Sequence, residues 1–390
     1  MTSSATTTAG KRRRSDHPLA RLLLDSIDDE IRGTVPLSAY GDVNAADVET
    51  ASFIHKVTPA VYLHLRGSGD APPEMVEPLM RRYQGQVARH LQVLADLAAL
   101  AKTLDGTDIS WAVMKGPVLA ERLWSRPDLR MYYDLDILVD RRRFGDVLEL
   151  LVATGSKLLE QNWPLIQQRV RAEVSLQLPN GAALDLHWHA VNDRRQRSQF
   201  TFPIAEMLAR SVKVEVGAST VPTLDPSDTL LHLAYHTAHS GGHCLMWLKD
   251  IERATADPDL DWAQTLRRAR AYGLALPLAM VLVRTARVIG FEFAPPAAAF
   301  APARRSAWGV LATAVDTWRP PPMLPHDKHP AQMPFKNVRS STLASLRPTL
   351  SWVRERRIPA IDPREAKKHV EGGDAARAAY LVALQGPREP

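Results

Sequence analysis

The spacing of apolar side chains predicts helices throughout the first hundred residues. Residues 74–104 show the clearest period, with apolar positions recurring every three or four residues, as on one face of a helix. These positions are Val87, Leu91, Leu94, Leu97 and Leu100. Residues 17–32 and 44–65 follow the same period. We therefore expect a helical region over residues 17–104, preceded by a disordered tail over residues 1–16.

The pattern changes after this region, where short apolar runs alternate with helical patterns. The strand-like runs are 109–114, 134–139, 174–178 and 183–189, and the helical segments begin at 117 and 141. The last two strand-like runs flank Asn180-Gly181, a pair typical of a tight hairpin turn. Residues 105–224 are therefore predicted to form a layer of strands and helices that includes antiparallel pairing.

Helical patterns return after residue 225 and continue for about four segments. They occupy residues 229–240, 245–256, 261–273 and 276–290. We expect a helical domain over residues 225–318. Because prolines crowd residues 319–334 and basic residues follow, residues 319–390 are predicted to form a Pro-rich linker and a basic C-terminal extension. The whole chain is thus predicted to belong to the α+β class.

Composition narrows the class of protein further. The chain has 390 residues, of which 45% are hydrophobic and 24% charged, a balance that excludes a wholly disordered, collagen-like or coiled-coil protein. The single cysteine, Cys244, excludes an intramolecular disulfide and a zinc site made of cysteines alone. The longest apolar stretch, Leu274–Ile289, is interrupted by proline and arginine and is too short to span a membrane. We therefore expect a cytoplasmic protein without a membrane partner.

The net charge of +6 suits an anionic ligand. Scattered arginines are as common on ordinary solvated surfaces, so nucleic acid is permitted as a partner but not favoured.

Two carboxylates stand out on one predicted strand. Asp134 and Asp136 are two residues apart, so they point to the same face, whereas Leu135, Ile137 and Val139 point to the other. Two like charges this close repel unless a cation lies between them. Carboxylate pairs suit Mg²⁺, which proteins hold through one or two carboxylates together with substrate phosphates. The alternative interpretation is a solvated acidic strand edge.

A turn that suits phosphate precedes this strand. Lys115-Gly116 joins a strand-like run to a helix that begins at Pro117. A glycine allows close approach of a ligand, and the N–H groups of a helix N-terminus attract phosphate. Lys115 adds a positive charge there, and Arg130 lies near enough in sequence to Asp134 to reach the same phosphates. The alternative is an ordinary strand-to-helix turn.

A later strand carries a third carboxylate and two histidines. Asp185, His187 and His189 alternate with apolar residues, so they share one face. A third carboxylate is what a two-metal phosphoryl-transfer site requires. The two histidines could be a general base, metal ligands or exposed strand residues. A helical segment also places His232, His236 and His239 on one face, where they could bind Zn²⁺ or pack between helices. Together with His187 and His189, they could instead line an acceptor pocket.

In combination these motifs resemble a known family. The chain reads Met114-Lys115-Gly116, Leu119, Arg130, Asp134-Leu135-Asp136-Ile137-Leu138-Val139 and Leu184-Asp185-Leu186-His187-Trp188, and later Leu230-Leu231-His232-Leu233, His236, His239 and Leu245-Met246-Trp247-Leu248-Lys249-Asp250. This series resembles the uncharacterised bacterial nucleotidyltransferase family of the DNA polymerase β-like superfamily, over about residues 85–290.

The resemblance implies a small mixed sheet surrounded by helices and a transfer of nucleoside monophosphate from a nucleoside triphosphate. The donor is expected to be ATP, and the acceptor is an unidentified small molecule, protein or RNA. Asp134, Asp136 and Asp185 would bind Mg²⁺ or Mn²⁺. Lys115-Gly116 would replace the Gly-Ser phosphate loop of better-known members, with Pro117 where the serine is expected.

Two alternatives stay open. The absent serine motivates a catalytically inactive module of the same fold that binds a nucleotide or a partner. A metal-dependent glycosyltransferase also uses an Asp-x-Asp motif, although the Lys-Gly turn and the third carboxylate argue against it.

Overall fold

The computed structural model describes residues 17–291, 297–321, 323–324, 329–354, 365 and 367–386. The predicted tail over residues 1–16 lies outside the described residues. Within the described ranges, no helix is both long enough and apolar enough to cross a membrane.

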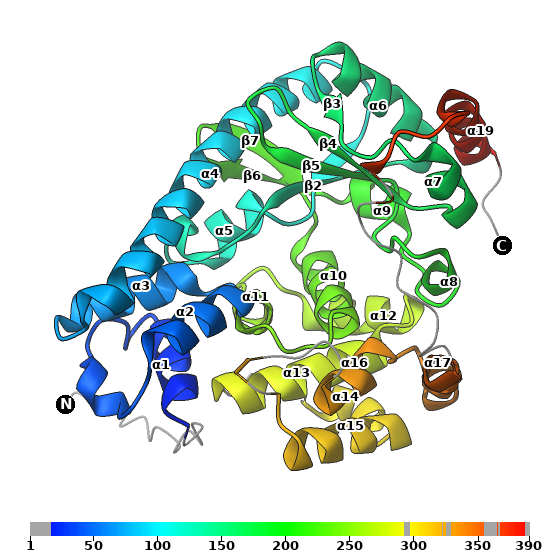
Figure 1. Ribbon diagram of the computed structural model, residues 1–390. Coiled ribbons are helices and arrows are strands. Elements are labelled where there is room, and N and C mark those ends of the chain that lie inside the picture. The colour runs from blue at the N-terminus through cyan, green and yellow to red at the C-terminus, as the bar shows by residue number, and fades with distance from the viewer. Residues whose placement is uncertain are drawn as a thin grey trace, which may run out of the picture.

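A seven-stranded mixed sheet forms the centre of the described structure, in the order β3-β4-β5-β2-β1-β7-β6 (Figure 1). The strands are β1 Trp111–Val113, β2 Asp134–Val139, β3 Lys157–Leu158, β4 Glu173–Gln177, β5 Ala183–His187, β6 Val212–Val216 and β7 Ser219–Thr223. The central strand β2 pairs antiparallel with β1 and parallel with β5. The two strands that carry the predicted carboxylates are therefore neighbours in the sheet.

The predicted hairpin between β4 and β5 is confirmed. Its turn includes Gly181 at a φ of 99°, a backbone angle that favours glycine. The buried carboxylate of Asp96 accepts hydrogen bonds from the backbone N–H groups of Asn180 and Ala182 at 2.9 Å. The hairpin β6–β7 was not predicted, although residues 212–216 alternate strictly between valine and charged residues and Gly217 follows them.

In the described part of the chain, four α-helices precede the sheet, within the range where helices were predicted. They are α1 Pro18–Ser26, α2 Ala45–Ile54, α3 Thr58–Ser68 and α4 Pro73–Asp105. Figure 1 shows α4 running from these N-terminal helices along the sheet. The predicted apolar face of α4 is partly wrong, because Leu91 is 61% exposed. The buried stripe instead runs through Val93, Leu97, Leu100 and Leu104.

The helices predicted over residues 17–32 and 44–65 are longer than the helices in the structure. Helix α1 ends at Ser26, and the Asp28 side chain beyond it accepts the backbone N–H of Glu30, which competes with helical hydrogen bonding. Residues 44–65 form two helices, α2 and α3, because the chain turns sharply at His55 and Lys56.

Two cores cover the two faces of the sheet. One face buries Leu135, Ile137 and Leu186 against α4 and α6. The other face contributes Met114 and Leu138 to a core that it shares with α10 and α13. Helices that follow β1 are α5 Pro117–Leu123, α6 Phe144–Ala153, α7 Trp163–Arg169, α8 Arg194–Arg197 and α9 Ile204–Ala209.

A group of helices lies below the sheet in Figure 1. They are α10 Pro226–His239, α11 Leu245–Thr255, α12 Trp262–Ala271, α13 Ala275–Ile289, α14 Ala297–Arg304, α15 Ala307–Trp318, α16 Met333–Lys336 and α17 Thr342–Arg354. Together with the sheet and the N-terminal helices they confirm the predicted α+β class.

The C-terminal helix α19, Gly373–Gln385, returns to the sheet. Its Tyr380 and Leu384 belong to the same apolar core as the strands. The Tyr380 hydroxyl donates to the carbonyl of Arg171 at 2.6 Å and accepts from the Trp188 indole at 2.7 Å. The described end of the chain, which was predicted as part of an extension, thus covers the edge of the core.

Candidate functional site

Strand register brings the predicted carboxylates together. In the parallel pair of β2 and β5, Asp136 lies opposite Asp185, and Leu138 lies opposite His187. In the adjoining hairpin, Ser175 and Glu173 of β4 lie opposite Asp185 and His187. Because side chains alternate along each strand, these polar groups share one face of the sheet while the apolar residues between them fill the core on the other.

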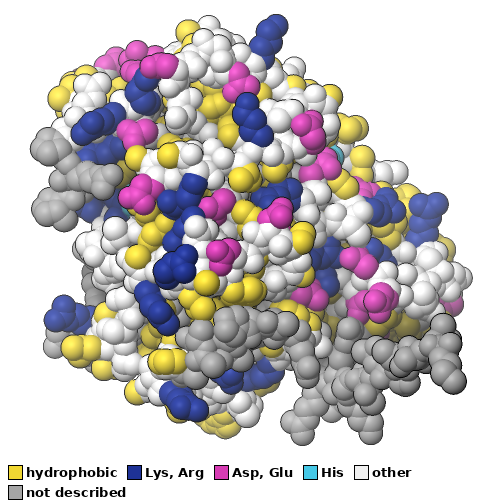
Figure 2. Space-filling model, turned by 180° about the vertical axis from the view of Figure 1, so that it is seen from behind, with side chains coloured by type: hydrophobic (Ala, Val, Ile, Leu, Met, Phe, Trp, Pro, Cys, Tyr) yellow, Lys and Arg dark blue, Asp and Glu magenta, His cyan; other side chains and the backbone are white. Residues whose placement is uncertain are grey.

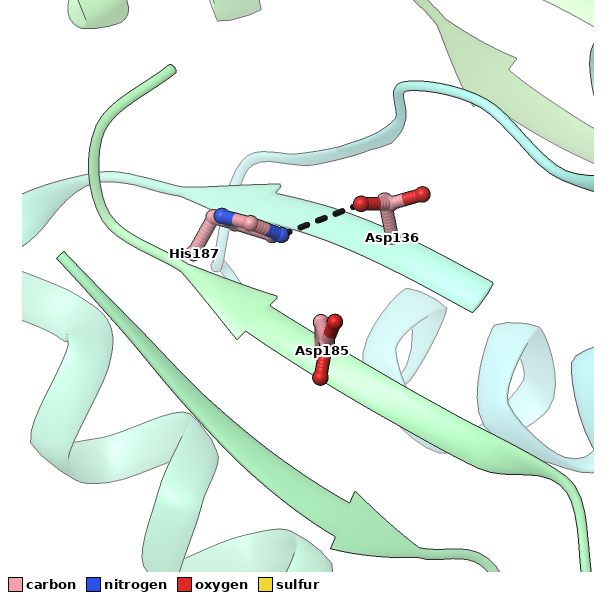
Figure 3. A group of neighbouring side chains, drawn as sticks. All are labelled: Asp136, Asp185 and His187. Carbon is pink, nitrogen blue, oxygen red and sulfur yellow. Dashed lines mark hydrogen bonds and ion pairs between the residues drawn. The ribbon is translucent and has the colours of Figure 1, made fainter. Parts of the chain in front are cut away.

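Three of these side chains form a compact group of metal-ligating atoms. Asp136, Asp185 and His187 each offer one ligand atom, and the three atoms lie within 4.8 Å of one another (Figure 3). His187 Nε2 lies 3.2 Å from Asp136 Oδ1. Asp134 was predicted as a ligand and is not one of these three, although it lies on the same face at the start of β2. Its role as a ligand stays a prediction.

The donor set suits a divalent cation. Two carboxylates provide the oxygen ligands that Mg²⁺ prefers, and an imidazole nitrogen extends the choice to Mn²⁺ and other transition metals. Burial raises the pKa of Asp185 to about 6, and the neighbouring charges of Glu173 and Asp136 add to that rise. Burial and the charge of Asp136 likewise raise the pKa of Asp134. A bound cation would stabilise the ionised form of these buried carboxylates.

Lys115 lies inside the same group. Its ammonium is 3.0 Å from Asp136 Oδ1. Burial alone would raise the pKa of Asp136, but the charges of Lys115 and His187 outweigh it and hold that pKa below its ordinary value. The same contacts raise the pKa of Lys115 and of His187 against the effect of their burial. Asp136 is therefore the ionised centre of the site.

The turn that carries Lys115 requires the following glycine. Gly116 has φ 65° and ψ −126°, a conformation that L side chains rarely adopt. A Cβ atom there would lie 3.0 Å from the carbonyl oxygen of Asp134. Two residues before Gly116, Met114 donates its N–H to the carbonyl of Asp136 at 3.0 Å. The Lys-Gly turn is thus pressed against the strand that carries both aspartates.

Comparison with known proteins identifies the family. A family model described as "uncharacterised nucleotidyltransferase" matches residues 43–290. The chain belongs to this nucleotidyltransferase family. No curated protein matches the sequence. A crystal structure of an antigenic nucleotidyltransferase-like protein from Paracoccidioides brasiliensis has 17% identity, covers 54% of this chain and 97% of its own, and has a TM-score of 0.34, which marks a remote likeness.

In this member of the family, Arg130 has a different environment from the one the sequence suggested. It was predicted to contact phosphates, but its side chain is 4% exposed and pairs with Asp250, which is fully buried. The guanidinium donates to both carboxylate oxygens of Asp250, at 2.8 to 3.2 Å, and to the Gly116 carbonyl at 3.3 Å. The Trp124 indole also donates to Asp250 at 2.8 Å. Arg130 therefore holds the Lys-Gly turn through its hydrogen bond to the Gly116 carbonyl.

The five histidines predicted as site residues lie in different environments. His187 is part of the metal-ligating group. His232 and His236 of α10 are buried near Lys115. Burial is the main cause that lowers the pKa of each imidazole, and the positive charge of Lys115 lowers it further; the pKa of His232 falls to about 3. His239 stacks on Tyr235, away from the carboxylates. His189 accepts the backbone N–H of Val191 and packs edge-on against Phe202.

His232 has an incomplete set of contacts. The residue is 4% exposed, and neither ring nitrogen has a hydrogen-bond partner in the part of the chain that the structure describes. A buried polar group of this kind usually meets a water or a ligand.

Two further polar residues of the site, Glu173 and Ser175, were not predicted from the sequence. Glu173 Oε2 lies 3.5 Å from His187 Nδ1, and the Ser175 hydroxyl donates to Asp185 at 2.6 Å. The alternation of β4 would have revealed both, since they face the same side as Asp185. The predicted strand began at residue 174 and so excluded Glu173.

Proposed function

We propose that this protein is a nucleotidyltransferase that uses Mg²⁺ or Mn²⁺ to transfer a nucleoside monophosphate, from ATP or another nucleoside triphosphate, to an acceptor. The observation that carries this proposal is the group of Asp136, Asp185 and His187 with Lys115 beside it. Family membership supports the reaction class. We place the reaction in the cytoplasm, where nucleoside triphosphates are abundant.

Each side chain has a role in this proposal. Asp136 and Asp185 would hold the divalent cation, with Asp134 beside them and His187 as a nitrogen ligand. The bound cation would neutralise charge on the triphosphate. Ser175 and Glu173 orient Asp185 and His187 through the contacts described above. Lys115 keeps a positive charge next to the transferred phosphate, and Gly116 allows the close contact between the Lys-Gly turn and the strand of the aspartates.

The acceptor would enter from the side of α10. There, the two unpartnered nitrogens of His232 offer one donor and one acceptor to a hydroxyl, and the low pKa of His232 keeps its ring neutral. The acceptor hydroxyl attacks the α-phosphorus, and pyrophosphate leaves. A nucleic-acid acceptor is permitted but not favoured, because the net charge of +6 is modest for a nucleic-acid-binding protein. Over the face drawn in Figure 2, acidic and basic side chains are interleaved.

One observation favours a second candidate. Lys115 and His187 already surround the carboxylate of Asp136 with positive charge, so the site is partly neutralised without a metal ion. A module that binds the nucleotide without transferring it would have the same arrangement. The loop serine expected of active superfamily members is replaced by Pro117.

Label transfer separates the two candidates. Each α-labelled nucleoside triphosphate would be incubated with the protein, Mg²⁺ or Mn²⁺ and a cell extract that supplies acceptors, and both pyrophosphate and labelled product would be measured. The variant Asp136→Asn/Asp185→Asn tests the site. Asp108→Asn, which changes an aspartate whose side chain is 82% exposed, is the matched control.

We expect label on an acceptor with the wild-type protein and the control, and a loss of at least about 100-fold in the double variant. Metal-dependent nucleotide binding without label transfer would favour the second candidate. Transfer that persists in a folded double variant would refute the assignment of the site.

A further inference from the structure

A lysine from the N-terminal helices reaches the site from outside the sheet. Lys56 lies in the turn between α2 and α3 and has a φ of 55°. Among the described residues other than glycine, only Lys56 and Val170 have positive φ. A left-handed conformation costs an ordinary residue about 1–2 kcal/mol, so it persists only where the surroundings hold it, and such residues concentrate at functional sites.

The surroundings of Lys56 do hold it. The preceding residue, His55, is fully buried, and its Nε2 lies 2.8 Å from the carbonyl of Met323. His55 Nδ1 accepts the backbone N–H of Leu245, and the His55 carbonyl accepts that of Met246. The turn is therefore bound to the first residues of α11, so the chain segments before and after the sheet fix Lys56 together.

The ammonium of Lys56 lies between two aromatic rings. It is 5.4 Å from the ring centres of both Tyr133 and Trp247, and it has no ion pair within the ranges that the structure describes. A contact with an aromatic face holds a cation without neutralising its charge. The charge of Lys56 is therefore available to an anion.

These aromatic rings place Lys56 beside the carboxylates. Tyr133 directly precedes Asp134, and Trp247 packs edge-on against His236 at 5.1 Å. The charge of Lys56 acts on both Asp134 and His236. The Arg89 guanidinium also lies close to the Tyr133 ring, 5.0 Å from its centre. Two cations thus contact the residue before Asp134.

We propose that Lys56, together with Arg89, binds the β- and γ-phosphates of the nucleoside triphosphate and so receives the leaving pyrophosphate. This inference rests on the proposed function. The reason is that few positive charges remain for the phosphates. The carboxylates offset much of the charge of bound metal ions, and the ammonium of Lys115 is paired with Asp136. The strongly anionic phosphate tail then needs further cations. Lys56 and Arg89 supply two, because both contact Tyr133, the residue that precedes Asp134.

Calorimetric titration with non-hydrolysable α,β-methylene analogues tests the inference. All four bases would be used, each with Mg²⁺, and the corresponding nucleoside monophosphates would be titrated in parallel. The main variant is Lys56→Asn, because asparagine tolerates positive φ and removes the cation. Lys56→Arg restores a cation, and Arg89→Gln is a second, independent variant. Lys102→Gln, an exposed lysine of α4, is the matched control.

We expect Lys56→Asn to weaken binding of the triphosphate analogue by about 10-fold to 100-fold, as the loss of a charge-assisted contact does, while monophosphate binding stays unchanged. Lys56→Arg should recover most of the affinity, and Arg89→Gln should also weaken only the triphosphate analogue. Lys102→Gln should behave as wild type.

Three different results would overturn the inference, and the titrations distinguish them. Unchanged triphosphate affinity in both Lys56→Asn and Arg89→Gln would show that the cations do not contact the phosphate tail. An equal loss for triphosphate and monophosphate would show that they act elsewhere in the site. If the wild-type protein binds none of the four analogues, the proposed function itself fails, and this inference fails with it.

Discussion

The buried pair of Arg130 and Asp250 leads to a prediction that separates a structural arginine from a phosphate ligand. The side chains are 4% and 0% exposed, and three donors from Arg130 and Trp124 converge on the one carboxylate. Removing one partner of a buried ion pair leaves the other charge unpaired, at a cost of about 3–5 kcal/mol. Asp250→Asn and Arg130→Gln should each lower the free energy of unfolding by that amount.

The two changes made together should cost less than their sum. Because no unpaired charge is left in the double variant, the two sites should couple by about 2 kcal/mol or more. Urea unfolding, followed by tryptophan fluorescence, measures all four proteins. The control is Asp108→Asn, which breaks an exposed contact with Arg143 and should cost at most about 1 kcal/mol.

Nucleotide titrations on the same proteins complete the test. Asp250 does not contact a phosphate in either interpretation of Arg130. Asp250→Asn should nevertheless reduce label transfer, because Arg130 loses its ion pair and no longer holds the Gly116 carbonyl. If Arg130→Gln proved as stable as wild type but bound triphosphate weakly, the structural role would be refuted and the phosphate role predicted from sequence would be restored.

Further predictions concern the turn, the acid stability and the C-terminal helix. Gly116→Ala should cost about 2–4 kcal/mol and reduce label transfer, because the new Cβ meets the strand that carries Asp134. Gly69→Ala has a similar φ with nothing near its Cβ, so it should cost only about 1 kcal/mol and leave transfer intact; equal effects would contradict this reasoning. Burial lowers the pKa of His55 to about 4, so the unfolded chain binds a proton first as the pH falls below about 6.5, and stability drops in that range. Urea melts at pH 7.5 and 5.0 should show a loss about 2 kcal/mol larger in wild type than in His55→Gln, and parallel losses would exclude the histidine. Tyr380→Ala should lower the free energy of unfolding by about 3–5 kcal/mol, as loss of a buried aromatic does. Val382→Ala on the same helix, 68% exposed, should change it by at most about 0.5 kcal/mol; similar values for the two would show that α19 does not stabilise the core.

Alternation along single strands was readable from the sequence. Asp134 and Asp136, and likewise Asp185 and His187, share a face because side chains alternate in any strand. The hairpin at Asn180-Gly181 was readable for a similar reason, since its turn residues impose a local geometry. These features depend on neighbours in the chain, so the chain order alone contains them.

Pairing between distant strands needed the tertiary structure. Asp136 lies opposite Asp185 because β2 and β5 are parallel and in that register, and a period of two residues sets the face of a strand but not its partner. Glu173 joins His187 by the same cross-strand register. The composition of the metal-ligating group was therefore decided by the sheet.

Burial decided the roles of the charged residues. In sequence, Arg130 and Lys56 are two basic residues among many. In the folded protein, Arg130 meets Asp250 from a helix more than a hundred residues away and becomes a buried support. Lys56 is held in a left-handed turn, and its ammonium lies beside the rings of Tyr133 and Trp247. The chain encodes which groups are charged, whereas the packing of distant segments determines which charges are neutralised and which stay available to a ligand.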